Sequence, residues 1–401
     1  MMRILPLACL GATLCMASAL AQAPTESANP DADNTAASKS PVAWVYVSSS
    51  IGDSDKSEIH AFNAASDGKL TPIAGSPFDD SVGWLAVNGK YLFGSATGGT
   101  YIDSYMMESN GALSYSASTD VLKSNSGCGS AAQIFLDHTG ANLYNFDYFA
   151  SDCSNNTYQS FVISKGAGKL TFMNDAGSDE ELNGYLTILA DNKFAYSSDC
   201  YHFGAAIYGF KRNSSGSLTM LNINPAYPTP PKGVSGWCPY LAKADTSNHV
   251  AIPMFPSNGF GDQNGPYQLA TYTADSSGNL TTTSKSTDMP AVEVGAVNTL
   301  STAPSGELLA VGGANGLQVF HFNGAGPITK YTGLLTSDSI NQVFWDNNNH
   351  LYAISQPSNK LWVFNVTRTS HNQATGSPYS INSPLGIAVQ PLPRYESSAH
   401  N

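Results

Sequence analysis

A short motif that recurs seven times along the chain limits the fold more than any other feature. In each copy an aliphatic or aromatic residue is followed three positions later by Phe or Tyr, as in Ile59/Phe62, Ile102/Tyr105, Tyr158/Phe161, Ile207/Phe210, Leu269/Tyr272, Leu317/Phe320 and Leu361/Phe364. Six copies continue through a turn that contains glycine to another apolar residue, from Leu70 in the first copy to Ile328 in the sixth. A regular self-similar unit of tens of residues indicates a repeat architecture.

Each repeat contains two hairpins and therefore four strands. Turns such as Asp67-Gly68-Lys69 and Asn110-Gly111-Ala112 follow the motif, and turns such as Asn88-Gly89-Lys90 precede it. Glycine at the centre of a short turn between alternating strands is typical of an antiparallel hairpin. Four antiparallel strands form the blade of a β-propeller. We therefore predict an all-β protein, a seven-bladed β-propeller of four-stranded antiparallel blades, which we letter A to D along each repeat.

The two ends of the repeat region complement each other. Residues 42–48 have the pattern of a B strand with no A strand before it, and residues 385–389 have the pattern of an A strand with nothing after it. Pairing them gives one blade three strands from the start of the chain and one from its end. Such three-plus-one closure removes the open sheet edges that an unclosed ring would expose, and open edges favour aggregation.

The segments outside the propeller are short. A basic start at Arg3 leads into an apolar stretch and then into small residues up to Ala23, which is typical of a cleaved signal peptide. We expect a signal peptide at 1–23, a disordered linker at 24–41, the propeller at 42–392 and a flexible tail at 393–401. The protein should be exported to the periplasm or the extracellular space, with no membrane span.

Charge and missing motifs exclude several functions. The formal net charge is -12, with no run of Lys or Arg to neutralise a nucleic-acid backbone. The serines lack the G-x-S-x-G pattern of a nucleophile elbow, and no glycine-rich pattern indicates a phosphate site. We expect no nucleic-acid partner and no cofactor. His249 and His350 begin B strands and are expected to be structural.

The repeats also resemble a known family. Val45-Tyr46-Val47-Ser48, the stretch from Lys69 to Phe78 and Gly376-Ser377-Pro378-Tyr379 resemble the YVTN-type repeats of lactonase-like seven-bladed propellers, including the 6-phosphogluconolactonase type. The resemblance spans residues 42 to about 392. It implies metal-independent hydrolysis of sugar lactones by polar residues at the channel mouth. Where those enzymes carry His and Glu, this chain has Ser48-Ser49 and Ser198-Asp199, so the resemblance assigns no catalytic set.

Long loops gather on one rim of the predicted propeller, in blades 3 to 5. Connections from D to A and from B to C share a rim, and loops longer than a hairpin turn are often functional. On this rim we select Asp147, Tyr148, Tyr201 and Trp237 as candidate ligand-binding residues, and His202 with Asp199 as a candidate acid/base pair. The alternative is that the aromatic rings only pack the loops against the blades.

Four cysteines remain after the signal peptide, and all of them fall on this rim. Oxidation in an exported protein favours two disulfides. We expect Cys128–Cys153 and Cys200–Cys238, although four cysteines allow three pairings. We predict no metal site, because none of these cysteines has another within the spacing of two to four residues that zinc sites use.

Two functions remain open. The first is a module that binds a small molecule, a carbohydrate or a protein through the long-loop rim. The second is a hydrolase that opens a lactone or sugar lactone.

Overall fold

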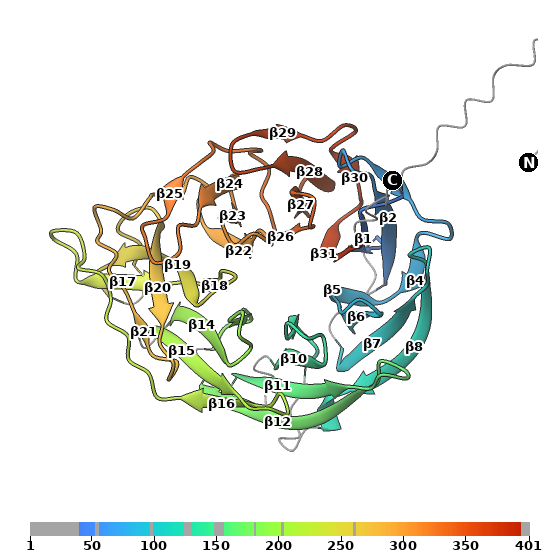
Figure 1. The fold of residues 1–401 in the computed structure, drawn as a ribbon, viewed down its shortest axis with the longest axis horizontal. Helices are drawn as coiled ribbons and strands as arrows, with labels where there is room; N and C mark the ends of the chain where they lie inside the picture. Colours follow the sequence, from blue (N-terminus) through green and yellow to red (C-terminus); the bar gives the residue numbers. More distant parts are fainter. Residues whose placement is uncertain are drawn as a thin grey trace, which may run out of the picture. The chain divides into compact units, whose positions relative to one another are not determined.

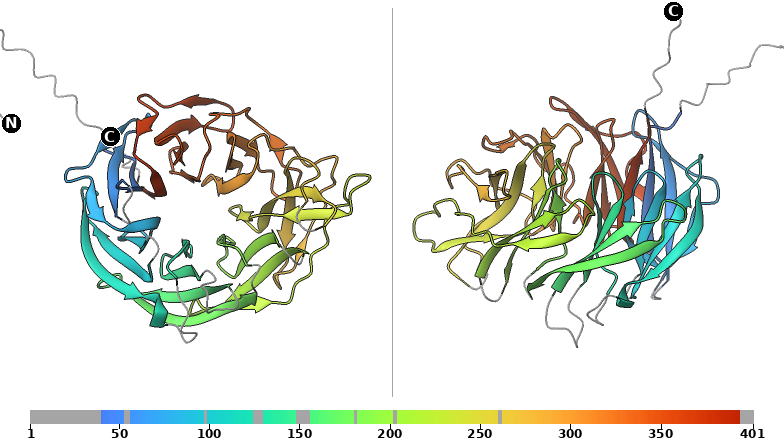
Figure 2. Two further views of the ribbon diagram at one scale, coloured as in Figure 1. Left: turned by 180° about the vertical axis from the view of Figure 1, so that it is seen from behind. Right: turned by 60° about the horizontal axis from the view of Figure 1, so that its bottom comes forward.

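The computed structural model describes residues 40–52, 56–96, 99–123, 130–147, 156–179, 182–201, 204–259 and 262–393. All of these residues belong to one compact unit, Lys39–Asn401. Seven antiparallel sheets of four or five strands stand around a common centre as blades (Figures 1 and 2). The predicted seven-bladed β-propeller is confirmed.

Blades 1 to 3 each have four strand positions, in the order A to D from the centre outward, and two short strands share the D position of blade 1. Blade 1 contains β31 (Pro384–Pro391), β1 (Ala43–Ser50), β2 (Ser57–Ala64), and β3 (Leu70–Pro72) with β4 (Phe78–Asp80). Blade 2 contains β5 (Val82–Val87), β6 (Tyr91–Ala96), β7 (Tyr101–Met107) and β8 (Leu113–Asp120). Blade 3 contains β9 (Ile134–Leu136), β10 (Asn142–Asp147), β11 (Asn156–Ile163) and β12 (Leu170–Asp179).

Blades 4 to 7 repeat this arrangement. Blade 4 contains β13 (Thr187–Ile188), β14 (Phe194–Tyr201), β15 (Gly204–Arg212) and β16 (Leu218–Leu221). Blade 5 contains β17 (Gly236–Pro239) with β18 (Lys243–Ala244), β19 (His249–Ser257), β20 (Gln268–Ala274) and β21 (Leu280–Thr281). Blade 6 contains β22 (Val297–Thr302), β23 (Leu308–Gly313), β24 (Gly316–His321) and β25 (Thr329–Lys330). Blade 7 contains β26 (Gln342–Trp345), β27 (His350–Ser355), β28 (Lys360–Val366), and β29 (His371–Gln373) with β30 (Tyr379–Ser380).

The first and last strands close the ring. β31 pairs antiparallel with β1, and Val45 faces Val389 while Val47 faces Ile387. In Figure 1 the last strand, drawn red, lies beside the first, drawn blue. The predicted three-plus-one closure is therefore confirmed. Because these side chains are almost fully buried, the closing pair also completes the core between blades 7 and 1.

The recurring motif explains how the blades hold each other. Its two residues are three positions apart on a C strand, and an odd separation on a strand places side chains on opposite faces. Ile59 accordingly packs into the core between blades 1 and 2, while Phe62 packs into the core between blades 7 and 1. Leu317 and Phe320 divide in the same way between the two cores that flank blade 6. Each copy of the motif thus joins one blade to both neighbours.

A tyrosine hydroxyl adds a polar contact at several of these joints. Three B strands carry a buried tyrosine whose hydroxyl donates to a glycine carbonyl in the C–D turn of the next blade: Tyr46 to Gly111 at 2.9 Å, Tyr144 to Gly216 at 2.7 Å, and Tyr196 to Gly278 at 2.9 Å. All three glycines have positive φ, which disfavours other residues. The turn of one blade is thereby fixed on the strand of the previous blade.

The joint between blades 3 and 4 has a further ion pair. The guanidinium of Arg212 lies 2.6 Å from the buried carboxylate of Asp137 and also donates to the hydroxyl of Tyr144. Burial raises the pKa of Tyr144 to about 12, so this phenol remains a hydrogen-bond donor at neutral pH. Within the described residues, no helix is both long and apolar enough to cross a membrane.

We expect Gly216→Ala to destabilise the propeller more than Gly233→Ala. Both glycines have positive φ, so both substitutions carry backbone strain of about 1–3 kcal/mol. A Cβ at residue 216 would lie 2.2 Å from the side-chain amide of Asn142, whereas a Cβ at residue 233 would meet nothing within 4 Å. Urea unfolding of the two variants measures the difference. Equal losses of unfolding free energy would contradict this account of the joint.

Candidate functional site

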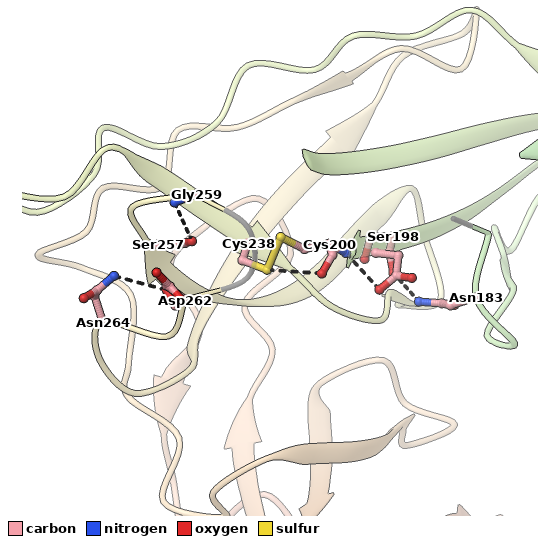
Figure 3. Close-up of a disulfide and its surroundings, with 9 residues drawn as sticks. Asn183, Ser198, Cys200, Cys238, Ser257, Gly259, Asp262 and Asn264 are labelled. Atoms are coloured by element: carbon pink, nitrogen blue, oxygen red, sulfur yellow. Dashed lines mark hydrogen bonds between the residues drawn. A yellow bond between two sulfur atoms is a disulfide. The ribbon is translucent and has the colours of Figure 1, made fainter. Parts of the chain in front are cut away.

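A disulfide joins blades 4 and 5 on the rim that carries the D–A and B–C connections, which we call the loop rim. Cys200 lies near the end of β14 and Cys238 lies in β17, and their sulfur atoms are bonded (Figure 3). This predicted pairing is confirmed, although both cysteines lie within strands and not in the flanking loops where we placed them. The other predicted pair, Cys128–Cys153, lies outside the described residues.

Asp199 is the candidate residue that the structure places among other polar groups on this rim. Its Oδ1 accepts a hydrogen bond of 2.8 Å from the backbone N–H of Cys200, so the disulfide strand orients the carboxylate. Burial, and after it the negative charge of Asp199, raises the pKa of Tyr240. Burial, Tyr240 and Asp199 together raise the pKa of Tyr267 to about 12. The charge of the carboxylate therefore acts on both phenols, and both phenols stay neutral at physiological pH.

Asn183 anchors the D–A loop of blade 4 beside this carboxylate. Its Nδ2 donates to the carbonyl of Ser198, and its Oδ1 accepts from the hydroxyl of Ser197 at 3.1 Å and from the N–H of Tyr185 at 2.9 Å. Figure 3 shows Asn183 reaching toward Ser198, on the same strand as the disulfide. Two of these bonds hold the loop against β14 and the third ties Tyr185 to Asn183, so Tyr185 has a fixed position.

Two aromatic rings meet at the centre of the propeller. Trp84 of blade 2 and Tyr185 of blade 4 make an edge-to-face contact with ring centroids 6.0 Å apart. The hydroxyl of Tyr185 donates to the carbonyl of Asn298 of blade 6 at 2.7 Å. Blades 2, 4 and 6 are thus linked across the ring. Sequence reasoning missed both rings, although each lies the same number of residues before an A–B turn.

The same rings line a central cavity of about 120 Å³. Its walls come from residues next to or within the A strands of blades 2 to 7 and are mainly apolar, with Phe135, Leu300 and Phe344 among them. Lys243 of β18 also lines this space. No motif in the sequence marks these positions, because the A strands are short and are brought together only by ring closure.

Asp147, a predicted ligand-binding residue, lies inside blade 3. It is 5% exposed, and its carboxylate accepts from the N–H of Ser130 at 2.9 Å and from the amide of Gln159 at 3.4 Å. Burial raises the pKa of Asp147. Burial and the charge of Asp147 also raise the pKa of Asp175. These contacts place Asp147 in an internal polar network of the blade.

The aromatic candidates are not gathered into one surface among the described residues. Trp237 is 4% exposed and its indole N–H donates to the carbonyl of Pro228 at 2.9 Å, so it packs the long D–A loop as the alternative reading expected. Tyr148 and His202 lie outside the described residues, and only the backbone of Tyr201 is described, at the end of β14. The proposed pairing of His202 with Asp199 therefore stays a prediction.

The opposite rim contains two Asp–His contacts in A–B turns. His249 lies 2.6 Å from Asp245 and His350 lies 2.6 Å from Asp346, in each case between Nδ1 and Oδ2. His350 is buried, and its Nε2 is 3.3 Å from the carbonyl of Ser66 in blade 1. These contacts agree with the structural role expected for both histidines. In the part of the chain that the structure describes, no group of three His, Cys, Asp or Glu side chains could hold a metal ion.

Comparison with known proteins identifies the fold. No family model matches the sequence, and no curated protein matches it. A solved periplasmic gluconolactonase from Pseudomonas aeruginosa superimposes with a TM-score of 0.64 at 14% identity, covering 88% of this chain and 99% of that one. A putative 6-phosphogluconolactonase from Bacteroides fragilis gives 0.60 at 14% identity, covering 86% and 97%. Another from Bacteroides uniformis gives 0.59 at 13%, covering 88% and 100%. Such identities establish the fold alone, and that fold is the seven-bladed propeller that the repeats indicated.

We expect the double substitution Cys200→Ser/Cys238→Ser to lower the free energy of unfolding by about 2–4 kcal/mol, because the crosslink restricts the unfolded chain. Chemical denaturation without reductant measures this loss. Reductant should destabilise the wild type by at least as much as the double substitution does. A wild type that is no more stable than the variant would contradict a stabilising role for this disulfide.

We expect Asp147→Asn to lower the pKa of Asp175 while leaving it above the ordinary value. The substitution removes the charge of Asp147, which is the second cause of the shift, and leaves burial, which is the first. Carboxyl ¹³C NMR titration of aspartate-labelled protein measures the pKa. Asp103→Asn is a matched control, because Asp103 contributes to the raised pKa of Asp80 instead. An Asp175 pKa that responds equally to both variants would disprove the coupling.

Proposed function

We propose that this chain is an exported propeller that binds a sugar lactone at the loop rim beside Asp199 and opens it by hydrolysis. The observation that carries the proposal is the carboxylate of Asp199, which the N–H of Cys200 orients and whose charge raises the pKa of Tyr240 and of Tyr267. The fold likeness supports it, because the Pseudomonas aeruginosa structure, whose chain is covered almost completely, is that of a periplasmic gluconolactonase.

The chemistry needs a base and a donor. In lactone opening, water adds to the carbonyl carbon, the bond from that carbon to the ring oxygen breaks, and the product is a hydroxy acid. Asp199 is proposed to accept the proton of the attacking water as general base. Tyr240, kept protonated by its raised pKa, is proposed to donate a hydrogen bond to the carbonyl oxygen as negative charge develops there. The proton then passes to the ring oxygen as it leaves.

Export is part of the proposal. The segment 1–23 is predicted to be a signal peptide, and a disulfide such as Cys200–Cys238 persists in oxidising compartments. An exported protein would meet unphosphorylated sugar lactones and not the sugar phosphates of the cytosol. The proposed substrate is therefore an unphosphorylated sugar lactone.

A module that only binds is the second candidate. The observation that favours it is the long D–A loop of residues 222–235, which Trp237 holds through Pro228. A fixed long loop on a propeller rim suits recognition of a carbohydrate, a small molecule or a protein without chemical change.

A lactone panel separates the two candidates. We expect the purified exported protein to hydrolyse glucono-δ-lactone faster than the uncatalysed reaction. The rate is measured as the release of acid at constant pH. We expect Asp199→Asn to lower kcat by about 100-fold or more, because a positioned base contributes at least that much. Asp262→Asn is the control: it removes one negative charge from the same rim, where only the main chain of Asp262 is seen to make hydrogen bonds (Figure 3).

The results of these measurements distinguish the hydrolase from the binding module. Calorimetric binding of the lactone without turnover would support the binding module and overturn the hydrolase. Turnover that Asp199→Asn leaves intact would overturn the role of this carboxylate. Neither binding nor turnover for any sugar or aliphatic lactone would overturn the lactone as the ligand.

A further inference from the structure

The central cavity contains a lysine that the loop-rim chemistry does not use. Lys243 is the only Lys, Arg, Asp or Glu among the residues that line the cavity. The rest of the wall is mainly apolar or aromatic, with Trp84, Phe135 and Phe344 contributing rings. A cationic group within an apolar wall is uncommon, because removing an ammonium group from water is costly.

The sheet places this lysine in the cavity. Lys243 lies in β18 opposite Ala251 of β19, and Ala251 is fully buried in the core between blades 5 and 6. Directly opposite residues in a sheet point to the same face. The side chain of Lys243 is therefore directed to the blade 6 side of its sheet, at the inner edge that bounds the cavity. Burial lowers the pKa of Lys243.

The lining does not neutralise this charge. Among the described residues, no acceptor lies within hydrogen-bond distance of the Nζ of Lys243. Gln342 is already used, since its Oε1 accepts from the N–H of Ile387 at 3.0 Å and its Nε2 is 3.5 Å from the carbonyl of Leu385. Thr299 and Ser301 also line the cavity, but they lie opposite Gly312 and Ala310 in the sheet, on the face of blade 6 that packs against blade 7. Lys243 is therefore the polar group on which binding of a ligand would depend.

We propose that this cavity binds a small organic carboxylate. The carboxylate would accept hydrogen bonds from Lys243, and its apolar part would lie against the rings. An ion pair inside an apolar cavity is stronger than one in water. A volume of about 120 Å³ suits a molecule of benzoate size and is well below typical pockets for larger ligands. This site differs from the loop-rim site and does not depend on lactone hydrolysis.

Benzoate is the probe, with neutral benzamide as its uncharged counterpart. We expect calorimetry of the full protein to show one benzoate site per chain. Benzoate binding to the wild type is the reference. We expect benzamide to bind the wild type, and benzoate to bind Lys243→Met, at least about tenfold more weakly than this, because a hydrogen bond to a charged group is lost in each case. Lys211→Met is the control, since Lys211 is an exposed lysine on β15. Affinity should fall at high pH, where the amine becomes neutral.

Thermal unfolding gives a second readout that also shows whether the variant folds. Without ligand, Lys243→Met should melt at a higher temperature than the wild type, because it removes an unpaired cation from the cavity. Benzoate should raise the melting temperature of the wild type and not that of Lys243→Met.

Several results would overturn the proposal. These are no benzoate binding at millimolar concentration, equal binding to Lys243→Met, or a lower melting temperature for ligand-free Lys243→Met. Inorganic phosphate that binds as tightly as benzoate would overturn the organic class of the ligand. Asp199→Asn should retain benzoate binding, and Lys243→Met should retain lactone turnover. Failure of this proposal and failure of the proposed hydrolase are therefore distinguishable.

Discussion

The hydrogen bond from a B-strand tyrosine to a glycine carbonyl of the next blade is the contact on which the ring depends most directly. In the joint between Tyr144 and Gly216, the buried phenol would lose hydration without a partner, and an unpaired buried hydroxyl is costly. The carbonyl becomes available only because the turn adopts positive φ, and a side chain at that position would collide with Asn142. At this joint the hydrogen bond, the positive φ of the turn and the glycine therefore depend on one another.

The interblade contacts have a consequence at the centre of the molecule. Some A strands are very short, with only two residues in β13 and in β18, so their own sheet contacts are few. Because every blade is held by both neighbours, the ring as a whole sets the positions of the A strands. The pairing of β31 with β1 completes the ring. Trp84 and Tyr185 can then meet from blades that are not adjacent, and the central cavity exists because seven joints close.

Charge is distributed between two environments in this architecture. Asp199 lies on the loop rim beside the disulfide, where the N–H of Cys200 orients the carboxylate. Lys243 lines the cavity, whose wall is mainly apolar and aromatic. A carboxylate on a rim and a cation in an apolar space select different ligands. The propeller can therefore be a scaffold for two sites of opposite charge preference.

The repeats, the closing strand and the Cys200–Cys238 disulfide could be predicted from the sequence. These features depend on the spacing of residues within a repeat, on turn residues, or on residues in adjacent repeats, so they can be recognised along the chain. The burial of Asp147 and Trp237 could not be predicted, because an Asp or Trp near a loop has the same local pattern whether it faces solvent or a neighbouring blade.

The central residues were decided by the tertiary structure alone. Trp84 and Lys243 lie in short A strands and Tyr185 lies just before one, and no sequence motif marks any of the three. Their meeting depends on contacts between segments tens to more than a hundred residues apart, which form only when the ring closes. The sequence by itself determined the blade, the number of blades and how the ring closes, because those are properties of a repeated local pattern. The tertiary structure decided what faces the centre, because that depends on all seven blades at once.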